Sequence, residues 1–326
     1  MSGQKYVSTG TLPTPDLVES LVADAFARFR TETAGSVSQV YPALARVSPD
    51  RFGISVVATT GAVYEAGDAD IPFPIMSVAK PFVFALVSEA IGAEEVRRRV
   101  GVNATGQPFN SVDAVADSSD GLTNPMVNAG AIATTSLAPG DTEQERWRFI
   151  QEGLSAFAGR PLGIDAEVYA SASTTNERNR EIVGVLEKRG GIYCPAADAL
   201  DLYTTQSSLG VNAHDLAVMG ATLADGGVNP LTGVKVVSEI TCRHTLAVMT
   251  TSGLYETSGD WLFDVGLPGK SGIGGGIVTV APGKGAVGTF APLLDPAGNS
   301  VKGQLVARYL SRRLGLDLFV SEPSTP

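Results

Sequence analysis

The sequence has few of the residues that bind metals or form disulfides. Its 326 residues include only two cysteines, Cys194 and Cys242, and only two histidines, His214 and His244. Two cysteines cannot build a disulfide framework, and so few are typical of a protein from a reducing compartment. The four residues have neither the Cys-x-x-Cys nor the His-x-x-x-His spacing of zinc sites. We therefore expect no metal site and a cytoplasmic location.

Positive charge is also scarce. Lysine and arginine total 24 against 34 aspartates and glutamates, which gives a formal net charge of -10. A chain this acidic lacks the basic surface that attracts nucleic acids and anionic membranes. No apolar run approaches the roughly 18 residues that a membrane-spanning helix needs. The opening residues 1–16 contain no apolar segment of the kind found in secretory signals. We expect neither nucleic acid nor a membrane as a partner.

The sequence does contain enough apolar material for a large folded core. Hydrophobic residues make up 44% of the chain and charged residues 18%, a balance typical of globular rather than disordered proteins. No internal repeat, low-complexity tract or linker divides the chain. We therefore expect residues 1–326 to form a single catalytic domain with a frayed tail at 321–326.

Hydrophobic patterning predicts strands at both ends of the chain. Apolar and β-branched runs on either side of turn residues predict hairpins at 51–68 and 276–290. Apolar residues at helical spacing predict one helix that begins at Pro15 and others at 77–91 and 300–314.

The stretch from about 92 to 250 is predicted to be mostly helical with polar loops. The order of elements along the chain is strands, a long helical insertion and then strands again. This order predicts an α+β fold, with one antiparallel sheet built from both ends of the chain and flanked by helices. We assign a sheet lobe to about 30–75 and 245–320 and a helical lobe to about 76–244. The boundary between two such lobes is a common place for a binding cleft.

Ser77 and Lys80 form the strongest local signal for chemistry. Residues three apart lie on one face of a helix, so the hydroxyl and the amine can meet. A serine becomes a nucleophile when a base removes its proton, and a lysine can be that base when burial disfavours its ammonium form. Apolar residues at 73–76 and 81–85 favour burial of Lys80. The alternative is a solvated lysine behind a serine that caps the helix.

A second signal is Lys270-Ser271-Gly272, at the start of a predicted strand. Ser-x-x-Lys together with Lys-Ser/Thr-Gly is the combination found in serine acylases. The following glycines allow a close approach of backbone and substrate, and a backbone N–H there can stabilise an oxyanion. A phosphate-binding loop is the alternative, but the segment lacks the GxxxxGK[ST] pattern and no helix follows it.

Two asparagines lie in the apolar stretch 122–132. Buried amides need hydrogen-bond partners, so each must cap a turn or bind something. We interpret Asn124 as a helix or turn cap and Asn128 as a binding residue.

Together these segments resemble the serine-dependent glutaminase family, which shares the fold of penicillin-binding proteins and serine β-lactamases. The resemblance extends from about residue 39 to 314. Besides the Ser77–Lys80 pair, the matching segments are Tyr41–Ala45, Gly106–Ser111, Asn124–Ala131, Arg178–Asn179, Tyr203, Gly253–Tyr255, Val265–Gly272 and Gly298–Gly303.

The resemblance implies hydrolysis of L-glutamine to L-glutamate and ammonia through an acyl-serine intermediate, without a metal or other cofactor. It implies that Ser77 is the nucleophile, that Lys80 is the base and that Tyr255 lies at the catalytic centre. The substrate-binding residues that it implies are Tyr41, Asn128, Asn179, Tyr203 and, through its backbone N–H in the oxyanion hole, Ile273. It also implies a homo-oligomer, and we expect a homodimer or homotetramer.

One position departs from the family pattern. Seven residues before the asparagine that Asn179 matches, the family has a glutamate that pairs with the substrate's α-ammonium, and this chain has Ala172. A hydrogen bond to a charged group is worth about 1.5–3 kcal/mol. We therefore expect weaker glutamine binding, or a related γ-amide without a free α-amino group as substrate. Glu177 would lie on another helix face and would not replace the lost carboxylate.

Two other functions are alternatives. A β-lactam-reactive serine enzyme fits Ser-x-x-Lys and Lys-Ser-Gly, but the glutaminase-like segments and the lack of an export signal oppose it. A non-catalytic metabolite-binding relative fits Ala172. The intact Ser77, Lys80 and Tyr255 oppose that second alternative, because a binding protein has no need of them.

Overall fold

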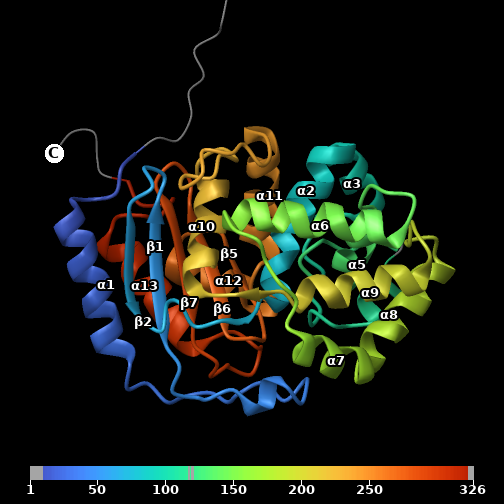
Figure 1. Ribbon diagram of the computed structural model, residues 1–326, viewed down its shortest axis with the longest axis horizontal. Coiled ribbons are helices and arrows are strands. Elements are labelled where there is room, and N and C mark those ends of the chain that lie inside the picture. The colour runs from blue at the N-terminus through green and yellow to red at the C-terminus, as the bar shows by residue number, and fades with distance from the viewer. Residues whose placement is uncertain (1–9, 117, 119–120, 322–326) are drawn as a thin grey trace, which may run out of the picture.

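A five-stranded antiparallel sheet organises the computed structural model, which describes residues 10–116, 118 and 121–321 (Figure 1). Its strand order is β2-β1-β7-β6-β5, so β1 and β7 pair and join the two ends of the chain. Of the frayed tail predicted at 321–326, residues 322–326 lie outside the described residues. The strands are β1 (Gly53–Ala58), β2 (Val63–Gly67), β5 (Gly269–Ser271), β6 (Gly276–Ala281) and β7 (Gly285–Phe290).

The central strands are buried along their whole length. Every residue of β1, β6 and β7 is buried, whereas β2 at the edge alternates between exposed and partly buried residues. Short, apolar and β-branched segments of this kind suit a sheet that is covered on both faces. Val56 of β1 lies opposite Val287 of β7, which places apolar side chains next to each other across the central pair.

Helices from different parts of the chain cover the two faces of the sheet. Helix α1 (Pro15–Phe29) and helix α13 (Val301–Arg313) pack on one face, with α12 (Ser258–Val265) beside α13. Helix α10 (Ala213–Ala224) packs on the other face against β1, β6 and β7. A Cβ on Gly220 of α10 would lie 2.6 Å from the Ala286 Cβ, so glycine lets this helix approach the sheet closely.

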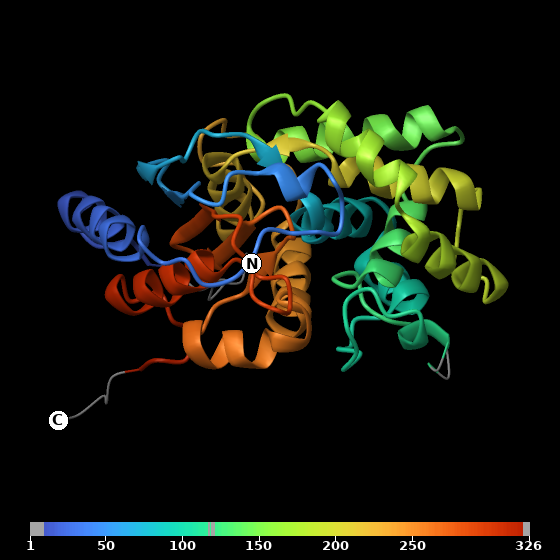
Figure 2. The same cartoon turned by 90° about the horizontal axis from the view of Figure 1, so that it is seen from below.

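Most of the remaining helices gather on the far side of α10 and form the helical part of the molecule (Figures 1 and 2). Helix α11 (Glu239–Ser252) lies between the two parts and packs against α2 as well as against α12 and β5. A two-stranded antiparallel pair, β3 (Phe73–Pro74) with β4 (Gly210–Val211), lies between the helical part and the sheet. The helices of the helical part are α2 (Ala79–Ile91), α3 (Ala93–Val100), α4 (Asp113–Ala116), α5 (Asn128–Ser136), α6 (Glu143–Ala158), α7 (Ala166–Thr174), α8 (Glu177–Lys188) and α9 (Ala196–Ser207).

The predicted α+β fold is confirmed, and so are the hairpins and the three predicted helices. The hairpin at 51–68 contains β1 and β2, and that at 276–290 contains β6 and β7. Two placements differ from the expected lobes. Helix α10 lies on the sheet although it falls within 76–244, and α1 packs on the sheet although it precedes residue 30. Local periodicity identifies a helix but not the surface that it will cover.

No single helix in the described ranges is long and apolar enough to cross a membrane. Within those ranges, one pair of helices, Met76–Ile91 and Ala93–Val100, has the length and composition when its two parts are taken together, but it is bent by 119°.

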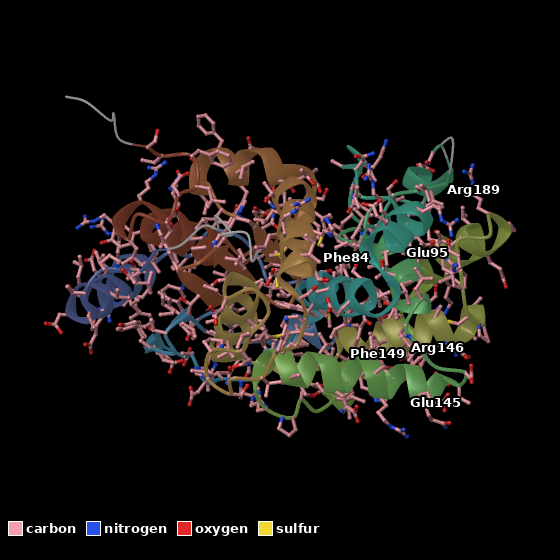
Figure 3. The ribbon with its side chains drawn as sticks, turned by 90° about the horizontal axis from the view of Figure 1, so that it is seen from above. Phe84, Glu95, Glu145, Arg146, Phe149 and Arg189 are labelled. Carbon is pink, nitrogen blue, oxygen red and sulfur yellow. The ribbon has the colours of Figure 1, made fainter. Side chains whose placement is uncertain are left out.

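Aromatic side chains join the sheet to the helical part. The rings of Phe73 and Phe290 stack with centroids 4.1 Å apart, and Phe82 of α2 meets Phe157 of α6 at 5.1 Å. Figure 3 labels Phe84 on α2, which belongs to the same buried cluster. This core fixes α2, and therefore the residues at its start, relative to the sheet.

Replacing Phe290 by alanine should lower the free energy of unfolding by about 3–5 kcal/mol, because its ring is 1% exposed and its loss leaves a cavity. Phe263 on α12 is a matched control, since its ring is 91% exposed, and its replacement by alanine should change stability by less than about 0.5 kcal/mol. Urea unfolding followed by circular dichroism measures both. Equal losses in the two variants would contradict this description of the core.

Candidate active site

Ser77 lies in a short 3-10 turn, Met76–Val78, which leads directly into α2. The backbone around it is strained, because the preceding Met76 has a φ of 48°. Tyr255 has a φ of 57°, and no other non-glycine residue in the described ranges has a positive φ. Such conformations cost energy and are typically held at functional sites by the surrounding structure. Both strained residues lie beside Ser77.

Lys80 is buried one turn further along α2, and its side chain is 2% exposed. Its Nζ donates to Asn128 Oδ1 at 2.7 Å and to the Met126 carbonyl at 3.3 Å. These acceptors are neutral, so they do not offset the removal of the ammonium from water. Burial lowers the pKa of Lys80 from 10.5 to about 7. The alternative of a solvated lysine is therefore wrong.

A chain of amide groups leads from Lys80 toward the surface. Asn128 at the start of α5 donates to Asn179 Oδ1 at 2.9 Å, and Asn179 donates to Asn176 Oδ1 at 2.6 Å. Tyr203 donates to Asn128 Oδ1 at 3.1 Å, and the Tyr41 hydroxyl reaches Asn176 Oδ1 at 3.4 Å. These bonds fix the orientation of each amide, so the polar groups are arranged before a ligand enters.

Two tyrosine hydroxyls meet at Ser77. Tyr203 and Tyr255 are buried, and the Ser77 side chain is close enough to each phenol to lower its pKa slightly. Burial raises the pKa of Tyr255 to about 12 and that of Tyr203 well above its usual value of 10.0. Both phenols are therefore protonated at neutral pH. The Tyr255 hydroxyl also reaches the Ser271 carbonyl at 3.2 Å, and its ring lies 4.4 Å from that of Phe109.

Two backbone N–H groups are available next to the serine. Within the described part of the chain, neither the N–H of Ser77 nor that of Ile273 donates to a protein acceptor. The end of β5 runs close to Ser77, since a Cβ on Gly272 would lie 3.3 Å from the Ser77 nitrogen. Both residues line the same pocket, and free backbone N–H groups in a pocket suit a developing oxyanion.

Most of the predicted site residues line one pocket. Ala172 is among them, 3% exposed, and no carboxylate is found among the described residues of the lining. Lys80 and Tyr255 lie behind the wall and contact lining residues instead. The pocket is lined by Val40, Tyr41, Met76, Ser77, Phe109, Asn110, Asn128, Ala172, Thr175, Asn176, Arg178, Asn179, Tyr203, Thr204, Ser207 and Ile273.

The structure adds residues that sequence patterns did not identify. Asn176 connects Tyr41 to Asn179, and Phe109 packs on Tyr255. Phe109 lies within the segment 106–111 that matches the family, but nothing in the sequence indicates its contact with a residue 146 positions away. In the described residues, no three histidine, cysteine, aspartate or glutamate side chains come together as a metal site would require.

Comparison with known proteins identifies relatives over nearly the whole chain. A family model described as Glutaminase matches residues 35–319. Glutaminase 2 of Yersinia pestis is 65% identical over 320 residues, which cover 98% of this chain and 94% of that protein. The glutaminase of Mycobacterium ulcerans (strain Agy99) is 46% identical over 302 residues, 93% of this chain and 94% of that protein.

Solved structures of similar proteins also superpose on this chain. A probable glutaminase, ybaS, superposes with a TM-score of 0.93 at 40% identity and covers 95% of this chain and 100% of its own. Mglu in its glutamate form superposes with a TM-score of 0.87 at 38% identity, over 95% of this chain and 71% of its own. The expected β-lactamase-like architecture is therefore confirmed.

Replacing Lys80 by methionine removes a group whose pKa differs between the folded and unfolded chain. The pKa of Lys80 is about 7 in the folded protein and about 10.4 in the unfolded chain. At a pH between these two values the amine takes up a proton on unfolding. The free energy of unfolding therefore rises by about 1.4 kcal/mol per pH unit across this range because of Lys80. The methionine variant should therefore be more stable than wild type below pH 7. Between about pH 7 and about pH 9, the difference in stability between the variant and wild type should decrease by about 1.4 kcal/mol per pH unit.

Urea unfolding of both proteins across this pH range measures the effect. Lys188→Met is the control, because Lys188 is exposed on α8 and its loss should leave the slope unchanged. A stability difference between Lys80→Met and wild type that does not vary with pH would contradict a lowered pKa for Lys80.

Proposed function

This chain belongs to the glutaminase family and hydrolyses L-glutamine to L-glutamate and ammonia, and we propose that it does so through an acyl intermediate on Ser77. Identity of 65% to a named glutaminase over nearly the full chain supports the activity. The main support for this mechanism is that Lys80 is buried one helical turn from Ser77 and has a pKa of about 7.

Acylation begins with removal of the Ser77 proton. Near neutral pH a large fraction of Lys80 is the free amine, and that amine accepts the proton while Ser77 Oγ attacks the side-chain amide carbon of glutamine. Negative charge develops on the amide oxygen. The N–H groups of Ser77 and Ile273 stabilise it, and each such donor is typically worth about 10²–10³ in rate.

Ammonia leaves when the C–N bond of the tetrahedral intermediate breaks. The departing nitrogen takes a proton from the Lys80 ammonium, and the protonated hydroxyl of Tyr255 beside Ser77 positions that transfer. Water then attacks the acyl ester and gives its proton to Lys80. Collapse of this second intermediate releases glutamate and returns the proton to Ser77 Oγ, so the enzyme regains its starting state.

The amino-acid end of the substrate lies against the amides of the pocket in this proposal. Asn128, Asn179 and Tyr203 supply fixed donors and acceptors, and Tyr41 covers them from the loop before β1. The structure of Mglu in its glutamate form supports glutamate as a ligand of this chain. We further propose a homodimer or homotetramer in the cytoplasm, which sedimentation of the purified protein and cell fractionation test.

Replacing Ser77 by alanine should reduce ammonia release from L-glutamine by at least about 10⁴-fold, because the nucleophile is lost. Wild-type enzyme quenched during turnover should carry a glutamyl adduct on Ser77 in mass spectra, and the variant should carry none. Ser88→Ala, a buried serine further along α2, is the control and should retain activity. Full activity without Ser77 would exclude acyl-serine chemistry, and a wild type without turnover would favour the binding-protein alternative.

Replacing Ala172 by glutamate should strengthen glutamine binding. A carboxylate at this buried position in the pocket wall would pair with the substrate's α-ammonium, and a bond worth about 1.5–3 kcal/mol lowers KM by about 10-fold or more. Turnover of a γ-amide without an α-amino group should not improve. Ala170→Glu, an exposed change on the same helix, controls for added charge. An unchanged KM for glutamine in Ala172→Glu would show that this position does not face the ammonium.

A further inference from the structure

Asn176 lies at the N-terminal end of α8 but does not cap that helix. It occupies the N-cap position, where an asparagine side chain usually accepts a hydrogen bond from a backbone N–H of the first turn. Among the described residues, its side chain caps no N–H of α8. The residue is instead 5% exposed and lines the pocket that contains Ser77. An asparagine that gives up a helix cap to line a pocket calls for a role in that pocket.

The neighbours of Asn176 determine which way its amide points. The Thr204 hydroxyl donates to the Leu200 carbonyl at 2.8 Å, so its oxygen is left to accept from Asn176 Nδ2 at 3.1 Å. The Oδ1 atom therefore points toward Asn179 and Tyr41. A reversed amide would place the N–H groups of Asn176 and Asn179 against each other, and the bond between them would be lost.

The direction of the amide chain is set at its other end by Lys80. Because the lysine amine donates, Asn128 presents Oδ1 to it and directs its own N–H group to Asn179 Oδ1. Asn179 in turn donates to Asn176 Oδ1 at 2.6 Å. All three bonds run in the same direction, and aligned hydrogen bonds polarise one another. The chain therefore ends in the pocket wall at an acceptor oxygen whose partial negative charge is strengthened.

Asn176 Oδ1 is not saturated by its neighbours. An amide oxygen has two lone pairs, and the short bond from Asn179 uses one of them. The Tyr41 hydroxyl lies 3.4 Å from the same oxygen, which is longer than the range of about 2.5–3.0 Å for hydrogen bonds between a hydroxyl and an oxygen. A stronger donor that enters the pocket can therefore use the second lone pair.

No carboxylate competes for such a donor in the described part of the lining. Glu177 follows Asn176 in the sequence, but it is exposed and pairs with Arg180 at 3.6 Å. Arg178 does line the pocket, and its positive charge favours a carboxylate over an ammonium. The α-ammonium of glutamine therefore needs a neutral acceptor here.

We propose that Asn176 Oδ1 accepts a hydrogen bond from the α-ammonium of bound glutamine, which makes Asn176 a specificity-determining residue of this pocket. This inference rests on the proposed function, because it assigns the amino group of that substrate to one atom. The α-amino group does not react, so the bond is equally strong in the substrate complex and in the transition state. Its loss should therefore raise KM and leave kcat nearly unchanged.

Two substrates separate recognition of the amino group from the rest of binding. Glutaric acid monoamide is glutamine without its α-amino group. Asn176→Ala should raise KM for L-glutamine by about 10-fold or more, because a hydrogen bond to a charged group is lost. KM for the monoamide and kcat for glutamine should each stay within about a factor of three. Ammonia release measures all of these constants.

Asn176→Asp tests the same contact in the opposite direction. Aspartate has nearly the shape of asparagine, and its carboxylate forms a stronger, charge-assisted bond with an ammonium. The ratio of kcat/KM for glutamine to kcat/KM for the monoamide should rise by at least about 10-fold. Because both substrates are compared in one variant, an effect of the new charge on Lys80 or Ser77 cancels in this ratio.

Asn212 at the N-cap of α10 provides a matched control outside the described lining of the pocket. Its side chain does cap its helix, since Oδ1 accepts from the Asp215 N–H at 2.7 Å. Asn212→Ala should lower the melting temperature because a helix cap is lost. It should leave the ratio between the two substrates unchanged.

An equal rise of KM for both substrates in Asn176→Ala would overturn the inference, because Asn176 would then only hold Asn179 in place. An unchanged KM for glutamine in that variant, or an unchanged substrate ratio in Asn176→Asp, would also overturn it. The aspartate variant decides the matter if the alanine variant does not fold. If wild-type protein released no ammonia from glutamine, the proposed function itself would fail, which keeps the two failures distinct.

Discussion

The removal of one lysine amine from water, without a carboxylate to compensate it, is the constraint on which this site depends. Lys80 makes its hydrogen bonds to an amide oxygen and a backbone carbonyl, so its ammonium form is disfavoured and its pKa falls to about 7. A carboxylate partner would raise that pKa and keep the amine protonated, so that it could not act as the proposed base. The amides of Asn128, Asn179 and Asn176 suit this requirement, because they orient the amine without charging it.

The sheet makes that environment possible by joining distant parts of the chain. Because β1 pairs with β7, the C-terminal hairpin and β5 come to lie beside the turn that carries Ser77. Ser77 comes from the 3-10 turn before α2, Ile273 from the loop after β5 and Tyr255 from a 3-10 turn after α11. The rigid sheet therefore supplies one side of the site and the helical part supplies the amide network on the other.

At Ala172 the pocket wall has no carboxylate, so the described lining offers no negative charge to a substrate ammonium. Arg178 is the charged residue in the described lining, and it already contacts the Asn110 carbonyl and Glu181. In the proposed binding mode, the zwitterionic end of glutamine thus meets mainly neutral groups. Neutral acceptors bind an ammonium more weakly than a carboxylate does, so binding depends more on shape and on the fixed amides than on charge pairing.

The sequence by itself indicated the two hairpins, three helices, a mostly helical middle and the candidate Ser77–Lys80 pair. Turn residues between β-branched runs identified both hairpins, and the apolar residues around Lys80 predicted its burial, because these signals act over a few neighbouring positions. The family pattern indicated Tyr41, Asn128, Asn179, Tyr203 and Tyr255. Only the tertiary structure decided that Asn176 links the amides, that Phe109 and Lys270 contact Tyr255, and that Met76 and Tyr255 adopt strained backbones. These features depend on packing between residues far apart in the chain, and no local pattern encodes that packing.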